Sequence, residues 1–182
     1  MSVMSDKWIT KMAIKKGMIT PFEGRLETKG ILSFGLSSYG YDIRLSQKIK
    51  RLTESQIIDP KNVKMDNFED CVSEKIIIDK GENILGMSYE YLKIPRNVLG
   101  LCMGKSSYAR LGIIVNITPL EPEWEGHITI SIINGSNHGV VLYPGEGIAQ
   151  IIFLKAHELC EVSYKDRKGK YQAQKDIEIT RI

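Results

Sequence analysis

Residues 127–133 read His-Ile-Thr-Ile-Ser-Ile-Ile, and the alternation in this stretch decides the fold class. Isoleucine occupies each even position, so these side chains share one face of an extended strand and predict a buried side. His127, Thr129, Ser131 and Ile133 lie on the opposite face, which is mostly polar. The pattern is typical of a half-buried β-strand.

Further short runs of β-type residues, bounded by turn residues, predict more strands along the chain. Turn signals include Pro95-Arg96-Asn97 and Pro144-Gly145. Many short strands at regular intervals predict a mainly β protein, a barrel or a sandwich. The runs are Tyr41–Leu45, Lys75–Asp79, Ile84–Ile94, Val98–Met103, Ile113–Thr118, Val140–Tyr143 and Ile148–Leu154.

One short helix is expected before these strands. Ser5 is a suitable N-cap, Trp8, Ile9 and Met12 follow at helical spacing, and Gly17 can end the helix. No internal repeat or linker interrupts the sequence, so we expect residues 1–182 to form a single domain.

Composition excludes several classes of protein. The chain has 182 residues, of which 42% are hydrophobic, and 25 Lys+Arg against 22 Asp+Glu give a net charge of +3. This charge is too small to argue for nucleic-acid binding, and no apolar run approaches the roughly 20 residues of a membrane helix. We therefore expect a globular protein that binds neither nucleic acid nor membrane.

The cysteines and the N-terminus favour a cytoplasmic protein. Cys71, Cys102 and Cys160 are odd in number and widely spaced, as reduced thiols often are, and residues 1–16 lack the continuous apolar segment of a signal peptide. The sequence has no CxxC or HxE pairing, so the zinc-dependent deaminase signature is missing and no protein metal site is expected.

Three segments carry side chains suited to chemistry. Residues 104–112 place two hydroxyls and two cations between glycines after a strand, either as a phosphate-binding loop or as a solvated loop. The acidic loop, residues 121–126, is either solvated or able to activate water or help hold Mg²⁺. Residues 163–174, SYKDRKGKYQAQ, cannot form core, so they form either a frayed tail or a cationic flap over an anion.

Four blocks of sequence together resemble the dCTP deaminase family, which is related to the trimeric dUTPases. They are SSYGYDIRL (37–45), GKSSYARLGIIVNITPLEPEWEGHI (104–128), PGEGIAQIIF (144–153) and YKDRKGKYQAQ (164–174). The resemblance covers nearly the whole chain. It implies a distorted β-barrel or jelly roll of the dUTPase-like type, with a short N-terminal helix and a C-terminal flap at 163–182.

The resemblance also implies a homotrimer with active sites between subunits, each binding dCTP or dUTP as a triphosphate with Mg²⁺. Lys105, Ser106 and Ser107 would contact phosphates, with Ser106 also near the reacting group, and Arg110 would supply a catalytic guanidinium to a neighbouring subunit. The remaining implied contacts are to the pyrimidine, from Val115 and Asn116, and to the triphosphate, from the flap residues Tyr164, Lys170 and Gln174.

One position departs from the family pattern. In the family, the strand after EPEWEG normally carries a glutamate that activates water for attack on cytosine C4, and Ser131 stands at that position here. The alternation of residues 127–133 leaves no register slip that restores a carboxylate, and the next acidic residue is Glu146. Loss of a general base weakens a reaction by about 10² to 10⁴.

Three functions therefore stay open on the sequence. The first is a zinc-independent dCTP deaminase that forms dUTP and ammonia, with Ser131 limiting the rate. The second is a diphosphatase that uses Glu121 to orient water on the α-phosphate of dUTP or another deoxynucleoside triphosphate. The third is a catalytically silent trimer that binds the nucleotide. Release of ammonia, release of diphosphate, or binding without either product distinguishes them.

Overall fold

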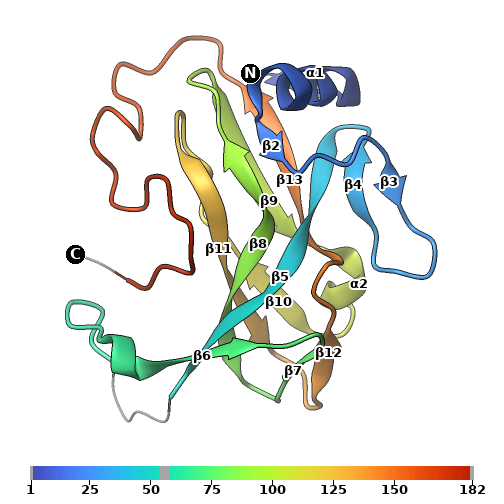
Figure 1. The fold of residues 1–182 in the computed structure, drawn as a ribbon, viewed down its shortest axis with the longest axis vertical. Coiled ribbons are helices and arrows are strands. Elements are labelled where there is room, and N and C mark those ends of the chain that lie inside the picture. The colour runs from blue at the N-terminus through green and yellow to red at the C-terminus, as the bar shows by residue number, and fades with distance from the viewer. Residues whose placement is uncertain (1, 54–57, 181–182) are drawn as a thin grey trace.

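A computed structural model describes residues 2–53 and 58–180 of the chain (Figure 1). The helices are α1 (Asp6–Lys16), α2 (Ser106–Ala109) and a 3₁₀ turn at Met65–Asn67. The strands are β1 (Ser2–Val3), β2 (Ile19–Thr20), β3 (Leu26–Glu27), β4 (Phe34–Ser37), β5 (Gly40–Leu52), β6 (Phe68–Val72), β7 (Ile76–Ile78), β8 (Asn83–Lys93), β9 (Val98–Gly104), β10 (Ile113–Asn116), β11 (Glu125–Asn134), β12 (Val140–Leu142) and β13 (Gly147–Lys155).

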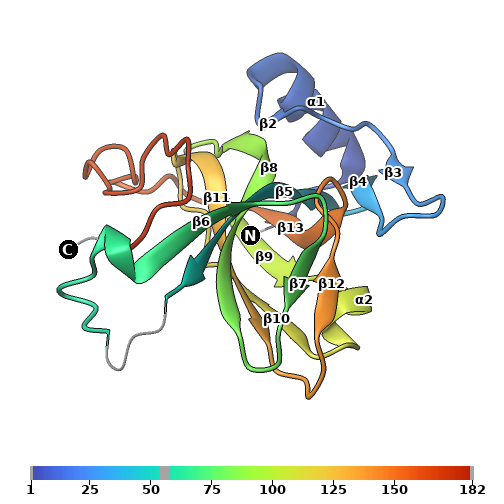
Figure 2. The ribbon, with the colours of Figure 1, turned by 60° about the horizontal axis from the view of Figure 1, so that its bottom comes forward.

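The strands form one large antiparallel sheet that curls on itself, and a separate β7–β12 ribbon (Figure 2). The main path of the large sheet is β1-β13-β5-β8-β11-β10, and β9 pairs with β13. Curling encloses the apolar faces of the strands, as expected for a distorted barrel. The prediction of a mainly β fold of the distorted-barrel type with a short N-terminal helix is confirmed.

Burial in β11 alternates as the sequence predicts. Ile128, Ile130 and Ile132 are buried, whereas Thr129 and Ser131 are half-buried. The isoleucines pack into the core with residues of β5, β8 and β13. The polar face of β11 is thereby held in one register, because a slip by one residue would bury Ser131 and expose isoleucine.

Helix α1 confirms the prediction for the N-terminus. It begins after Ser5 and ends at Gly17, whose φ of 62° is the left-handed conformation that glycine adopts readily. Ile9 is buried, and the ring of Trp8 lies 6.3 Å from that of Phe153 on β13. In the described ranges, every helix is too short or too polar to cross a bilayer.

The sequence analysis missed several elements. Strand β5 continues to Leu52, whereas the sequence predicted an end at Leu45. An irregularity between Leu45 and Ile49 shifts its pairing with β8 and interrupts the alternation, which explains why the second half of the strand was missed. Strand β6 pairs only with β5, and it carries no buried residue that would mark one face as apolar. The short strands β1 to β4 and the single-turn helix α2 were also not anticipated.

A largely buried ion pair links the neighbouring strands β5 and β8. Arg44 Nε lies 2.7 Å from Glu90 Oε1, and the Glu90 side chain is 0% exposed. Burial raises the pKa of Glu90, and the hydrogen bonds and charge of Arg44 oppose that rise. The guanidinium also lies between the rings of Phe34 and Tyr89. Removing either charged partner would leave the other buried and uncompensated.

Candidate functional site

The C-terminal tail, residues 163–174, folds back against the acidic loop and the start of β11. Tyr164 N–H donates to the Pro122 carbonyl at 3.0 Å, and His127 N–H donates to the Gln174 carbonyl at 3.0 Å. The Gln174 amide donates to the His127 carbonyl and, at 2.9 Å, to Thr129 Oγ1. Residues 163–180 of the expected flap are thus placed, whereas 181–182 lie outside the described residues.

The tail folds onto itself around one aromatic ring. Tyr164 accepts the Gly169 N–H at its carbonyl and the Tyr171 N–H at its hydroxyl, both at 2.9 Å. A Cβ atom on Gly169 would lie 2.2 Å from the Tyr164 ring, so this approach requires glycine. Trp124 Nε1–H donates to the Tyr171 carbonyl at 2.9 Å, which ties the folded tail to the acidic loop.

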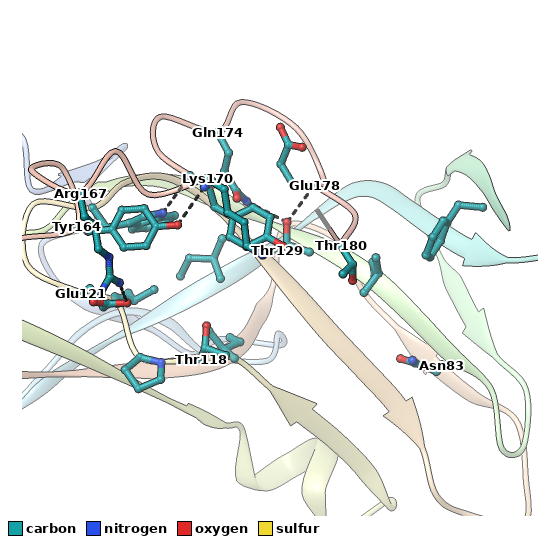
Figure 3. A pocket seen from close by; sticks show the side chains of 18 of the residues that line it. Asn83, Thr118, Glu121, Thr129, Tyr164, Arg167, Lys170, Gln174, Glu178 and Thr180 are labelled. Carbon is teal, nitrogen blue, oxygen red and sulfur yellow. Dashed lines mark hydrogen bonds and ion pairs between the residues drawn. The ribbon is translucent and has the colours of Figure 1, made fainter. Parts of the chain in front are cut away.

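A cavity of about 740 Å³ lies beneath the tail (Figure 3). Its size falls in the range of small-molecule sites. One wall is the tail, and the other consists of the β10–β11 connection with parts of β8 and β11. The polar residues that line it are Asn83, Thr118, Glu121, Thr129, Tyr164, Arg167, Lys170, Gln174, Glu178 and Thr180.

Four of the candidate residues come together in this cavity: Glu121, Tyr164, Lys170 and Gln174. The sequence analysis missed Arg167, although it lies within the quoted tail motif, three residues after Tyr164. Its guanidinium pairs with the Glu121 carboxylate and lies 5.1 Å from the centre of the Tyr164 ring. Cations on one wall and a carboxylate on the other are suited to a phosphorylated ligand accompanied by a cation.

Ser131 lies on the same face of β11 as Thr129, two residues further along the strand. Its hydroxyl donates to Asn83 Oδ1 at 3.2 Å, and Asn83 lines the cavity. Across the sheet it is paired with Asn116 of β10 and Leu85 of β8. Ser131 itself is not among the described residues that line the cavity. The position expected to hold a glutamate adjoins the cavity through Asn83 and Leu85, and its hydroxyl proton is already hydrogen-bonded.

Among the described residues, the acidic side chains lining this cavity are Glu121 and Glu178. Glu121 is paired with Arg167. The Glu178 backbone N–H donates to Thr129 Oγ1 at 3.2 Å, and Figure 3 shows its side chain turned away from Asn83. Neither carboxylate occupies the place beside Asn83 where Ser131 lies.

Val115 and Asn116 point to opposite faces of β10, as neighbours in a strand do. Asn116 is exposed on the face of Ser131, whereas Val115 is half-buried and packs against the core. The structure therefore brings only Asn116 of this pair to the face shared with Ser131.

The expected phosphate-binding residues lie on the other side of the molecule. Helix α2 and the C-terminal tail are at opposite sides in Figures 1 and 2. Lys105 Nζ is paired with the buried Asp42 carboxylate, and the Arg110 guanidinium donates to the Ser106 carbonyl at 3.0 Å. None of these residues, nor Ser107, is among the described residues that line the cavity under the tail.

Tyr108 anchors α2 to the sheet. Its side chain is buried, and its hydroxyl accepts the Tyr143 N–H at 3.1 Å. Burial raises the pKa of Tyr108 to about 12, so the phenol stays neutral and serves as a fixed support. Ser107 and Arg110, on either side of Tyr108, line shallow pockets at this surface.

Comparison with known proteins gives a consistent picture. Residues 3–156 match a family model described as dCTP deaminase-like. The chain is 49% identical over 187 residues to a dCTP deaminase of Ectopseudomonas mendocina and 50% identical over 188 residues to one of Nitrosomonas eutropha. Both alignments cover 100% of this chain and 100% of the relative.

A solved structure supports the fold. The 2'-deoxycytidine 5'-triphosphate deaminase of Agrobacterium tumefaciens superposes with a TM-score of 0.66 at 18% sequence identity. The match covers 86% of this chain and 49% of that protein, so the chain spans about half its length.

Proposed function

This chain belongs to the dCTP deaminase-like family, and from that membership we propose that it converts dCTP and water to dUTP and ammonia. The observation that carries the proposal is the cavity beneath the tail. Its tail wall presents Tyr164, Arg167 and Lys170, and its far end reaches the polar face of β11 beside Ser131. The cations are suited to binding the triphosphate, and the β11 end is suited to binding the cytosine ring.

We propose that the complete site forms between copies of the chain in a homotrimer. The two halves of the expected site lie on opposite sides of one subunit, so an exposed Arg110 can serve only another subunit's cavity. Exposed apolar side chains on β9, on β10 and directly after α2 support such an interface, because Met103, Leu111 and Ile114 are 59%, 54% and 55% exposed. A second copy would bury them and supply the phosphate-binding residues.

The proposed chemistry is slow because Ser131 cannot take a proton. Water attacking C4 of cytosine must lose a proton, and the leaving amino group must gain one to depart as ammonia. The Ser131 oxygen can accept a hydrogen bond from that water. A neutral hydroxyl that is hydrogen-bonded to the Asn83 amide is too weakly basic to take up the proton. The subunit therefore binds and orients dCTP well, and the proton-transfer step limits turnover.

Mg²⁺ fits this proposal as a partner of the nucleotide. Within residues 2–53 and 58–180, no group of three or more His, Cys, Asp or Glu side chains could form a protein metal cage. Mg²⁺ is commonly bound through substrate phosphates and retains several waters. It would neutralise part of the triphosphate charge, and the Glu121 carboxylate in the cavity wall would contact its water shell. The reaction is expected in the cytoplasm.

The direct test incubates the purified chain with dCTP or dUTP and Mg²⁺. Ammonia, diphosphate and the ligand-induced change in melting temperature are then measured. We expect stabilisation by dCTP, with slow ammonia release and no comparable release of diphosphate. Binding with neither product would contradict the deaminase proposal and favour a silent nucleotide-binding protein.

Glu121 supports a second candidate function, hydrolysis of a deoxynucleoside triphosphate to the monophosphate and diphosphate. Its carboxylate lies in the cavity wall opposite the tail, where it can orient water toward a phosphate. This candidate predicts that Glu121→Gln lowers diphosphate release by about 10², a larger loss than any change in ammonia release. Equal diphosphate release by the variant and the wild type would exclude Glu121 as the base.

Gly169→Ala is expected to weaken dCTP binding by about tenfold. The added methyl group would collide with the Tyr164 ring, so the tail could not retain the fold that forms the cavity wall. The affinity is measured by calorimetric titration. The control is Ala156→Gly, a change of similar size at an exposed site after β13. Gly145→Ala would be a poor control, because the positive φ of Gly145 makes a substitution there strained. Unchanged affinity in Gly169→Ala would contradict the role of the folded tail.

A further inference from the structure

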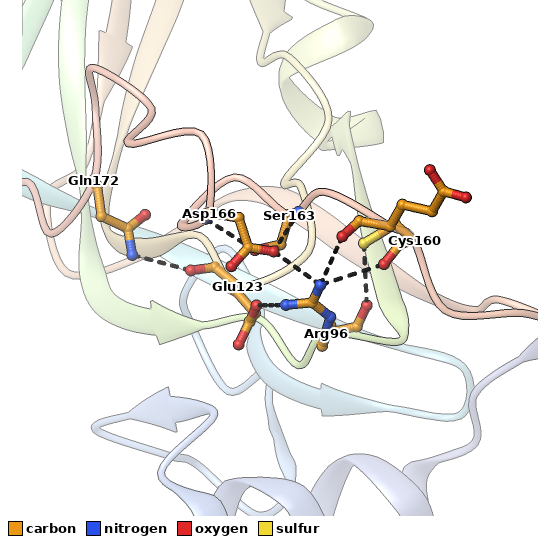
Figure 4. Close-up of polar contacts among 7 residues, drawn as sticks. Arg96, Glu123, Cys160, Ser163, Asp166 and Gln172 are labelled. Carbon is orange, nitrogen blue, oxygen red and sulfur yellow. Dashed lines mark hydrogen bonds and ion pairs between the residues drawn. The ribbon is translucent and has the colours of Figure 1, made fainter.

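Arg96 joins two segments that form opposite walls of the cavity (Figure 4). It lies in the turn between β8 and β9, outside the lining of the cavity. One side of its guanidinium donates to Glu123 Oε2 at 2.7 Å. The other lies 2.8 Å from Asp166 Oδ2 and donates to the Glu161 carbonyl at 3.0 Å. The planar fork of arginine allows all these contacts at once.

The two carboxylate partners of Arg96, Glu123 and Asp166, lie beside residues of the cavity wall. Glu123 is in the acidic loop between Glu121 and Trp124, and it has a φ of 62°, a left-handed conformation that is unfavourable for this residue type. The surrounding contacts must hold the loop in this shape. The Gln172 amide of the tail adds one, donating to the Glu123 carbonyl at 3.0 Å.

Asp166 is held as firmly on the tail side. Its carboxylate accepts the Ser163 N–H at 3.0 Å, and its own N–H donates to Ser163 Oγ at 3.2 Å. Ser163 is 1% exposed, so this reciprocal pair lies at a fixed point of the tail. The Ser163 N–H and the Arg96 guanidinium hold the pKa of Asp166 below its usual range, so the carboxylate stays charged near neutral pH.

We propose that Arg96 is a positioning residue for nucleotide binding. Arg96 fixes the start of the tail, at Asp166, to the acidic loop, at Glu123. It thereby holds the cavity wall in its binding shape before the ligand arrives. Preorganisation of this kind increases affinity because less ordering is required on binding. The inference rests on the proposed function for the identity of the ligand, whereas the anchoring of the tail is independent of it.

The proposal predicts a loss of binding without a loss of chemistry. Arg96→Gln removes the charge and most of the fork, so dCTP affinity should fall and KM should rise by about tenfold. Because Arg96 does not line the cavity, kcat should stay within about twofold of the wild type. Tryptic cleavage after Arg167, Lys168 and Lys170 should accelerate in the free protein.

Five further variants sharpen the test. Arg96→Lys keeps the charge but not the fork and should fall between wild type and Arg96→Gln. Asp166→Asn should resemble Arg96→Gln, and Arg96→Asp combined with Asp166→Arg should recover part of the affinity lost by Arg96→Asp alone. Arg25→Gln is the matched control, because Arg25 is 81% exposed and its contact with Glu27 spans 3.9 Å.

The outcomes separate the two proposals. Weaker binding and faster tail cleavage in Arg96→Gln, with near-normal kcat, support the positioning role. Unchanged affinity and unchanged cleavage, or a fall in kcat with KM constant, would overturn it. If the wild type binds no deoxynucleotide, the proposed function fails, and the rate of tail cleavage still decides whether Arg96 anchors the tail.

Discussion

Replacing Ser131 with glutamate is expected to raise the rate of ammonia release from dCTP by about 10² to 10⁴, the usual contribution of a general base. The side chain projects from the polar face of β11 beside Asn83, which lines the cavity. A carboxylate at this position would give the site a proton acceptor. The isoleucine face would not be disturbed, because Ser131 is only half-buried and lies on the opposite face.

The pH dependence of this gain identifies its cause. A glutamate that acts as a base works only when ionised, so activity of Ser131→Glu should rise as pH passes through its pKa. The ordinary pKa of a glutamate side chain is about 4.3. The wild type has no carboxylate at this position and should lack that step in its pH profile.

Ser131→Gln is the matched control, because it adds similar bulk and polarity without a proton acceptor. Ammonia release is measured for both variants under saturating dCTP, and melting temperatures establish that both are folded. Equal rates for the glutamate and glutamine variants would show that the missing base is not the limitation.

Arg110→Ala and Gln174→Ala are each expected to lower dCTP turnover by about 10² to 10³, the usual effect of removing a charged or oriented donor from an active site. Arg110 directly follows α2 and Gln174 belongs to the tail, and these two segments lie at opposite sides of the subunit in Figure 1. If each site combines the α2 side of one copy with the tail side of another, mixed trimers will contain some sites with both residues intact.

Mixing the two inactive variants gives a quantitative test of that arrangement. Random assembly at equal amounts leaves about one quarter of the sites intact, so about one quarter of the original activity should return. Both changes are made in the Ser131→Glu background to provide measurable rates, and dCTP binding is titrated in the wild-type background. Activity that stays at the level of the separate variants would contradict a site shared between subunits.

The strong alternation of residues 127–133 made β11 predictable, including the face that carries Ser131. Strands β8, β9 and β13 were predictable because their runs of β-type residues are bounded by turn signals. Strand β6 was not, because it pairs at the edge of the sheet and its exposed positions need no apolar pattern. In its partner β5, the register shift after Leu45 interrupts the alternation, so the second half of the strand could not be predicted.

The site could be predicted only in part from the sequence. Residue types and the family resemblance suggested Glu121, Tyr164, Lys170 and Gln174, and these line one cavity. The pairing of Arg167 with Glu121 joins positions 46 residues apart, and no local pattern encodes such a contact. The role of Arg96 could not be predicted from the sequence either, because Pro95-Arg96-Asn97 indicates only a turn.

The most direct measurement follows the fate of a single bound nucleotide. Wild type and Ser131→Glu are each mixed with less dCTP than there are sites, in the presence of Mg²⁺, quenched at intervals, and analysed for dCTP and dUTP. We expect both proteins to bind the nucleotide, with the base remaining cytosine on the wild type long after the variant has converted it to uracil. Conversion at the same rate by both proteins would contradict the account.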